Sequence, residues 1–104
     1  MAEQEYIIER VGIKNLDFTG TLIGSSSGPV PQLKIYRTKA GKFIGALRAD
    51  AERSNASSFE KPEDLITWLK GVIGSPISQA AQEAVEEAAK NDNVFRAAWN
   101  ERVD

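Results

Sequence analysis

The sequence predicts a small α+β domain, with a four-stranded, mostly antiparallel sheet followed by two or three helices packed on one of its faces. Three observations lead to this class. Segments of the first half alternate apolar and polar residues, as strands with one buried face do. The second half is rich in alanine and carries apolar residues at helical spacing. Strands first and helices afterwards are typical of α+β folds.

The length of 104 residues is normal for one hydrophobic core. We therefore expect a single domain over 1–104, with the sheet at roughly 5–50 and the helices at roughly 62–102.

Two strands are expected before residue 24. Tyr6 to Val11 is rich in β-branched and aromatic residues, and from Leu16 to Ile23 every second residue falls on one largely apolar face. We expect the helix-covered face of the sheet to be built from apolar residues of this strand and of the next two. They are Leu16, Phe18, Leu22, Leu33, Ile35, Phe43 and Leu47.

The next two strands should form a hairpin with a three-residue loop, 39–41, in which Gly41 takes the positive φ that such a turn needs. This loop places Tyr36 opposite Ile44 and Lys34 opposite Ala46. A two-residue loop at Ala40–Gly41 would sort the apolar residues less well between the two faces.

Helices are expected from Pro62 and from the Ser75–Pro76 pair, because proline suits the first helical position. Gly71 could cap the first helix, and the second should run over 77–90. Asn91–Asp92–Asn93 either ends that helix or caps a last one.

The second helix should face inward through Ala81, Ala84, Val85 and Ala88, and the last should carry Val94, Phe95, Ala98 and Trp99 on one side. The small-residue face around Ala80, Ala84 and Ala88 would pack within the chain or against a second copy. Trp68 and Trp99 are expected in the core.

Two stretches interrupt these patterns and are expected to be loops: Gly24–Pro31 and Arg53–Ser58. The first has glycines but lacks the spacing and the Lys-Ser/Thr pair of a phosphate-binding loop. The segment 48–53 is compatible with either a loop or a helix.

The composition excludes several kinds of chemistry. The chain has no Cys and no His. It can therefore form no disulfide, no thiolate nucleophile and no imidazole acid, base or metal ligand. No metal motif is present, and the paired glutamates of the second helix fit a solvated face. We expect no enzyme activity, no catalytic residue, no metal and no cofactor.

Charge is distributed unevenly along the chain. Residues 32–53 hold six basic and two acidic groups, although the whole chain has a net charge of -2. Basic groups neutralise phosphates, and an aromatic ring can stack on a base. The predicted outer face of the hairpin thus supplies the candidate binding residues Lys34, Tyr36, Lys39, Lys42 and Arg48. A solvated strand face also explains such residues.

The function expected from this elimination is that of a small accessory or regulatory protein acting by protein–protein interaction. The partner is another protein or a second copy in a homodimer. The alternative is nucleic-acid binding through the basic hairpin, and a third reading is a small-molecule site at Gly24–Pro31. The sequence has no apolar run long enough to span a bilayer and starts with an acidic segment, so a cytoplasmic location is expected.

Overall fold

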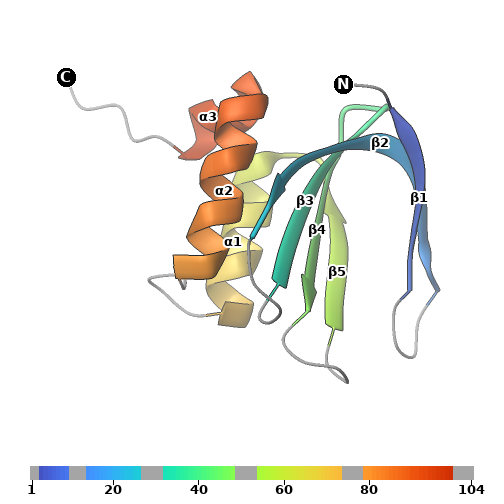
Figure 1. Cartoon of the computed structure of the whole chain (residues 1–104), viewed down its shortest axis with the longest axis horizontal. Coiled ribbons are helices and arrows are strands. Elements are labelled where there is room, and N and C mark those ends of the chain that lie inside the picture. The colour runs from blue at the N-terminus through green and yellow to red at the C-terminus, as the bar shows by residue number, and fades with distance from the viewer. Residues whose placement is uncertain (1–2, 10–13, 27–31, 49–53, 74–78, 100–104) are drawn as a thin grey trace.

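The computed structural model describes residues 3–9, 14–26, 32–48, 54–73 and 79–99. It confirms the α+β class, with strands first and helices afterwards (Figure 1). The elements, in chain order, are β1 (Gln4–Ile8), β2 (Leu16–Ser25), β3 (Gln32–Thr38), β4 (Phe43–Arg48), β5 (Ser54–Phe59), α1 (Pro62–Ile73), α2 (Gln79–Asn91) and α3 (Asn93–Trp99).

The sheet is an antiparallel meander in which each strand pairs with the next, in the order β1-β2-β3-β4-β5. It is strongly curled. The helices cover one face, while β1 and the first half of β2 arch over the opposite face (Figure 1). The sheet therefore has a convex side against the helices and a concave side away from them.

The number of strands differs from the prediction of four. Ser54–Phe59, most of which was expected to be a polar loop, forms β5 and pairs with the whole of β4, from Arg48↔Ser54 to Phe43↔Phe59. Serine and asparagine have low strand propensity, which is why the sequence pattern misses this element. Backbone pairing to β4 and burial of Ala56 override that propensity.

The β3–β4 hairpin has the predicted register, with Tyr36 opposite Ile44 and Lys34 opposite Ala46. Gly41 has a φ of +89°, which confirms the three-residue loop. The amide of Thr38 donates to the carbonyl oxygen of Lys42 over 2.8 Å, closing the turn.

The distribution of β2 side chains corrects the prediction for the helix-covered face. Leu33, Ile35, Phe43 and Leu47 lie in the core beneath the helices, as expected. Leu16, Phe18 and Leu22 lie on the opposite, concave face, because Leu22 pairs with Tyr36.

A β-bulge at Ile23 separates the two halves of β2, since the register shifts between Leu22 and Gly24. Beyond the bulge, Gly24 pairs with Ile35 and faces the helices. The extra residue also bends the strand, as bulges do. The Nδ2 of Asn91, at the end of α2, donates to the Ile23 carbonyl oxygen over 2.9 Å.

Close packing of α2 on β2 depends on small residues. A Cβ on Gly24 would lie 2.2 Å from the Ala84 carbonyl oxygen and 2.9 Å from the Ala88 amide nitrogen. The predicted inner face of α2 is confirmed, because Ala81, Ala84, Val85 and Ala88 are buried. The small-residue face that could have met a second copy thus packs inside the chain at Ala84 and Ala88.

The helix boundaries follow most of the predicted signals. Pro62 begins α1, and Asp92 caps α3 by accepting hydrogen bonds at Oδ1 from the amides of Val94 and Phe95. The predicted cap at Gly71 is wrong, because α1 continues to Ile73. Ser75–Pro76, Val11 and the segment 49–53 lie outside the described residues.

The aromatic residues of the helices complete the core. Phe95 is fully buried and lies 5.9 Å from the Phe43 ring centre, and Trp68 lies 5.5 Å from the Phe59 ring centre. Trp68 and Trp99 are partly buried against the core. Val94 departs from the predicted inner face of α3 and is 46% exposed, whereas its neighbour Phe95 is fully buried.

Candidate functional site

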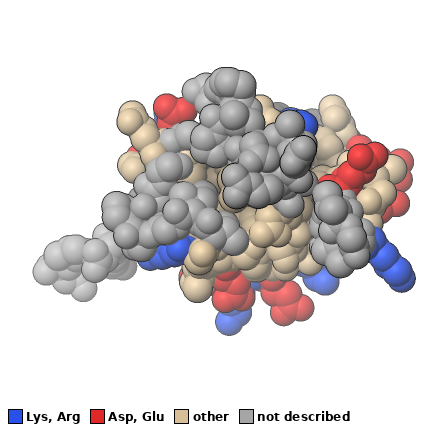
Figure 2. All heavy atoms as spheres, turned by 90° about the horizontal axis from the view of Figure 1, so that it is seen from below, with Lys and Arg blue, Asp and Glu red and all other residues tan. Residues whose placement is uncertain are grey.

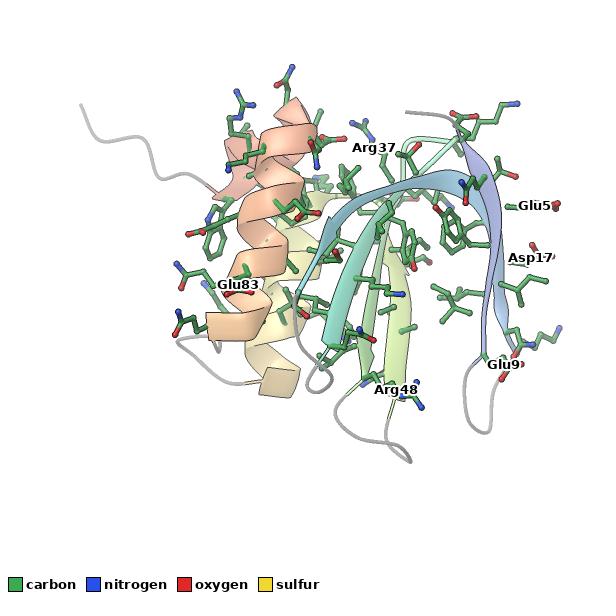
Figure 3. The ribbon with its side chains drawn as sticks, in the orientation of Figure 1. Glu5, Glu9, Asp17, Arg37, Arg48 and Glu83 are labelled. Atoms are coloured by element: carbon green, nitrogen blue, oxygen red, sulfur yellow. The ribbon has the colours of Figure 1, made fainter. Side chains whose placement is uncertain are left out.

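The five predicted binding residues do not form one patch. Lys39 and Lys42 lie at the tip of the β3–β4 hairpin, whereas Lys34 and Arg48 lie near its other end. Arg48 lies six positions after Lys42 at the far end of β4, which is about 20 Å at the rise of a strand. In Figure 3, Arg48 marks the lower end of β4, far from the hairpin tip.

Tyr36, the fifth predicted residue, is buried rather than exposed among these cations. It is 5% exposed, because β1 and β2 arch over it. Its ring centre lies 4.7 Å from that of Tyr6 and 5.2 Å from that of Phe18. Burial, together with the neighbouring Tyr6, raises the pKa of the Tyr36 hydroxyl above its usual value of 10.0. The Tyr36 ring therefore presents no face on which a nucleic-acid base could stack.

A cavity of about 340 Å³ opens on the concave face, between the start of β2, the hairpin tip and β5. Its apolar lining comes from Leu16, Phe18 and Ile44, and Ser58 closes the side formed by β5. Lys39 and Lys42 lie along its lining next to Thr38, so the structure brings two of the predicted site residues to one site.

The sequence patterns missed the apolar half of this cavity. They assigned Leu16 and Phe18 to the core beneath the helices, and Ser58 to a loop. Gly24, directly after the bulge at Ile23, is a local signal that could have indicated it, since an isolated glycine in a strand often marks a bulge.

A second surface lies on the outer face of the β1–β2 hairpin. Ile7 is 67% exposed there, and it pairs across the ladder with Asp17. Glu5 lies two residues before Ile7 in β1, and Glu9 follows directly after the strand ends at Ile8. Glu5, Glu9 and Asp17 are all exposed. Glu5 and Asp17 point outward from the hairpin in Figure 3, and acidic atoms gather on the same side of the molecule in Figure 2.

The edge of β1 is open in the part of the chain that the structure describes. β1 pairs with β2 and has no described strand on its other side. Its five residues, from Gln4 to Ile8, contain no lysine, proline or bulge, three of the devices that protect an edge strand from pairing, and Glu5 is their one charged residue. The β1 edge and the exposed Ile7 are therefore suited to contact with another chain.

Other polar clusters have structural roles. Arg37 and Asp92 form a partly buried ion pair of 2.7 Å between β3 and the start of α3. Gly24 and Ser25, the first two residues of the predicted Gly24–Pro31 loop, belong to β2 instead. Ser26, which follows them, accepts a hydrogen bond at Oγ from the Leu33 amide and is buried. Residues 27–31 of that loop lie outside the described residues.

Within the ranges given above, no group of three or more acidic, His or Cys side chains is arranged to hold a metal ion. Among the described helices, none is both long and apolar enough to cross a membrane. No family model, curated protein or solved structure matches this chain.

Proposed function

We propose that this protein is a non-enzymatic accessory or regulatory protein that binds an extended segment of another protein along β1. The open edge of β1 beside the exposed Ile7 carries this proposal. An unpaired strand edge offers a row of backbone donors and acceptors to a strand of a partner, and alternate side chains then give specificity.

The charges around Ile7 indicate the chemistry of the partner segment. Glu5 lies two residues before Ile7 in β1, Glu9 follows just after the strand, and Asp17 pairs with Ile7 across the ladder. A partner strand that carries an apolar residue between two basic ones would meet this pattern, because opposite charges on neighbouring strands attract.

A second copy of this chain fits the β1 edge less well. Antiparallel pairing of two β1 strands centred on Ile7 would place Glu5 opposite Glu9, and like charges directly opposite each other destabilise a strand pair. A basic segment of a different protein is therefore the occupant we propose, and the homodimer is an outcome that the experiment can reveal.

Peptide titration of the isotope-labelled protein tests this function. An end-capped pentapeptide, Lys-Thr-Val-Thr-Lys, should shift the amide resonances of Gln4 to Ile8 in a saturable way. The matched peptide Glu-Thr-Val-Thr-Glu should bind more weakly, and the difference should shrink as salt screens the charges.

Two variants distinguish binding at the β1 edge from nonspecific apolar binding. Ile7→Lys should abolish the shifts, whereas Val94→Lys, which changes an exposed apolar residue of α3, should leave them unchanged. Equal binding of the two peptides, or shifts confined to other elements, would contradict the proposal. Sedimentation at increasing concentration reports whether a second copy competes for the edge.

Nucleic-acid binding through the hairpin is the second candidate function. What favours it is the exposure of Lys39, Lys42 and Arg48 along one hairpin, with Lys34 half-buried near the Arg48 end. A labelled oligonucleotide should then show anisotropy that falls steeply with salt. Because the cations form two groups, the variants Lys39→Glu/Lys42→Glu and Lys34→Glu/Arg48→Glu would show which end of the hairpin is used. No binding at low salt would remove this candidate.

A further inference from the structure

The cavity on the concave face has a chemistry of its own, separate from the outer face of β1. We propose that it binds a small amphipathic anion, with an apolar body inside the cavity and one carboxylate at its mouth. The apolar lining, the fixed hairpin tip and the sign of the charge around the cavity all favour such a ligand.

The apolar lining is held in place by the residues behind it. Phe18 lies 5.4 Å from Tyr6 and 5.2 Å from Tyr36, measured between ring centres, so the three rings form one packed cluster. Ile44 is 3% exposed and lies beside this cluster, opposite Tyr36. A lining supported in this way can keep an apolar surface open, whereas an unsupported side chain would collapse into the space.

The hairpin tip that carries the two lysines is fixed by its backbone. The amide of Lys42 donates to Thr38 Oγ1 over 2.9 Å, and the amide of Lys39 donates to the carbonyl oxygen of Thr19 over 2.8 Å. The second of these hydrogen bonds joins the tip to β2, the strand that supplies Leu16 and Phe18. Lysine side chains thus emerge at a defined place beside the apolar lining.

The charge at the cavity is positive. Lys39 and Lys42 are exposed, and neither has an ion pair among the described residues. Asp17 also lines the cavity, but its side chain points outward from the β1–β2 hairpin (Figure 3). A carboxylate at the mouth would therefore meet two ammonium groups, and the Ser58 hydroxyl lies on the side formed by β5.

The size of the cavity limits the ligand to a small molecule. A volume of about 340 Å³ lies at the lower end of the range for ligand pockets. Such a pocket combines apolar walls with a few polar groups that orient the ligand. A medium-chain fatty acid or an aromatic carboxylate has the matching arrangement of one apolar body and one charged end.

Three eight-carbon probes test the class of ligand: octanoate, octanol and octyltrimethylammonium. Each is titrated into the isotope-labelled full chain below its micelle concentration. Octanoate should shift the amides of Phe18, Thr38, Ile44 and Ser58 in a saturable way, octanol should bind more weakly, and the cation should bind most weakly. No saturable shift with octanoate, or equal binding of anion and cation, would overturn the proposal.

Charge reversal at the mouth gives the sharper test. Lys42→Glu should weaken octanoate binding by at least about twofold, the effect of losing an exposed ion pair, and should narrow the difference in affinity between octanoate and octyltrimethylammonium, because Lys39 then lies beside a carboxylate. Lys70→Glu makes the same change on the exposed face of α1 and should alter neither affinity. An identical effect of the two variants would overturn a site at the hairpin tip.

Filling the cavity tests its location without a change of charge. Ser58→Phe places a ring on the exposed side formed by β5, where phenylalanine favours a strand. This variant should fold as the parent does, with the β4–β5 resonances retained, and should lose octanoate binding. Undiminished binding would place the ligand elsewhere and overturn the proposal.

Discussion

Arg37 in β3 donates a hydrogen bond from Nη1 to Oδ2 of Asp92 at 2.7 Å, across 55 positions of the chain. The other carboxylate oxygen of Asp92 accepts the amides of Val94 and Phe95 and so begins α3. The guanidinium of Arg37 also lies over the Phe43 ring, with Cζ 4.9 Å from its centre. One carboxylate therefore caps a helix and ties that helix to the sheet.

Two substitutions of Asp92 should separate these roles. Asp92→Asn keeps an oxygen that can cap α3 but loses the charge, and it should lower the free energy of unfolding by about 1 kcal/mol. Asp92→Ala loses both the cap and the ion pair and should lower it by about 2 kcal/mol. Urea denaturation measures both values. Equal destabilisation by the two variants would show that the cap contributes nothing.

Alanine should have opposite effects at two glycines, one where β2 packs closely on α2 and one on the exposed face of α1. Gly24→Ala would bring a Cβ against the Ala84 carbonyl oxygen, and overpacking of this kind costs about 1–3 kcal/mol. Gly71→Ala adds a Cβ with no atom within 4 Å, inside a helix, and should stabilise the protein by about 0.5–1 kcal/mol. Thermal unfolding of both variants tests this pair, and a neutral Gly24→Ala would mean that α2 can move away from the strand at little cost.

The turn of the β3–β4 hairpin requires the positive φ of Gly41. Gly41→Val should destabilise the protein by about 1 kcal/mol or more, because a β-branched residue resists that conformation. Gly41→Asn should cost less, since asparagine tolerates the left-handed region. The melting temperatures of the two variants provide the comparison. An unchanged midpoint for the valine variant would show that the turn does not require the positive φ of Gly41.

Burial of Tyr36 predicts a loss of stability at high pH. The pKa of Tyr36 is raised in the folded protein, so the folded state holds the phenolic proton more tightly than the unfolded state. Stability should be unaffected below the usual tyrosine pKa and should fall as the pH rises above about 10.

Tyr36→Phe removes the ionisable group and should show a smaller fall in stability over that range. Denaturation at pH 8 and pH 10.5 gives the comparison, and absorbance at 295 nm follows the phenolate directly. A parent and a variant that lose the same stability would mean that the Tyr36 hydroxyl ionises as easily as in the unfolded chain.

Local signals in the sequence were sufficient for several elements. The glycine of the hairpin loop and the alternation around it predict the register of β3 and β4, and Pro62 marks the start of α1. These signals act within a few residues, through the φ that glycine allows and the amide hydrogen that proline lacks.

Long-range packing decided the elements that the sequence patterns missed. β5 is polar and exists through its pairing with β4, and the bulge at Ile23 turns Leu16 and Phe18 away from the helices. Alternation within a strand gives which residues share a face, but a single extra residue exchanges the two faces.

The candidate site also depends partly on local signals and partly on long-range packing. Sequence patterns singled out Lys39 and Lys42 as candidate binding residues because charge is visible in a short window. They could not find the cavity beside them, because its lining comes from β2, β4 and β5, and they placed Tyr36 outside because nothing in its neighbourhood shows that β1 arches over it.

The sequence by itself determined the α+β class, the hairpin, most helix signals and the absence of His and Cys chemistry, because each depends on composition or on neighbours along the chain. The tertiary structure alone decided the curl of the sheet, the burial of Tyr36, the open edge of β1 and the cavity at the hairpin tip. Those features arise where segments distant in sequence meet, and the energy that selects them comes from contacts that no short window of sequence contains.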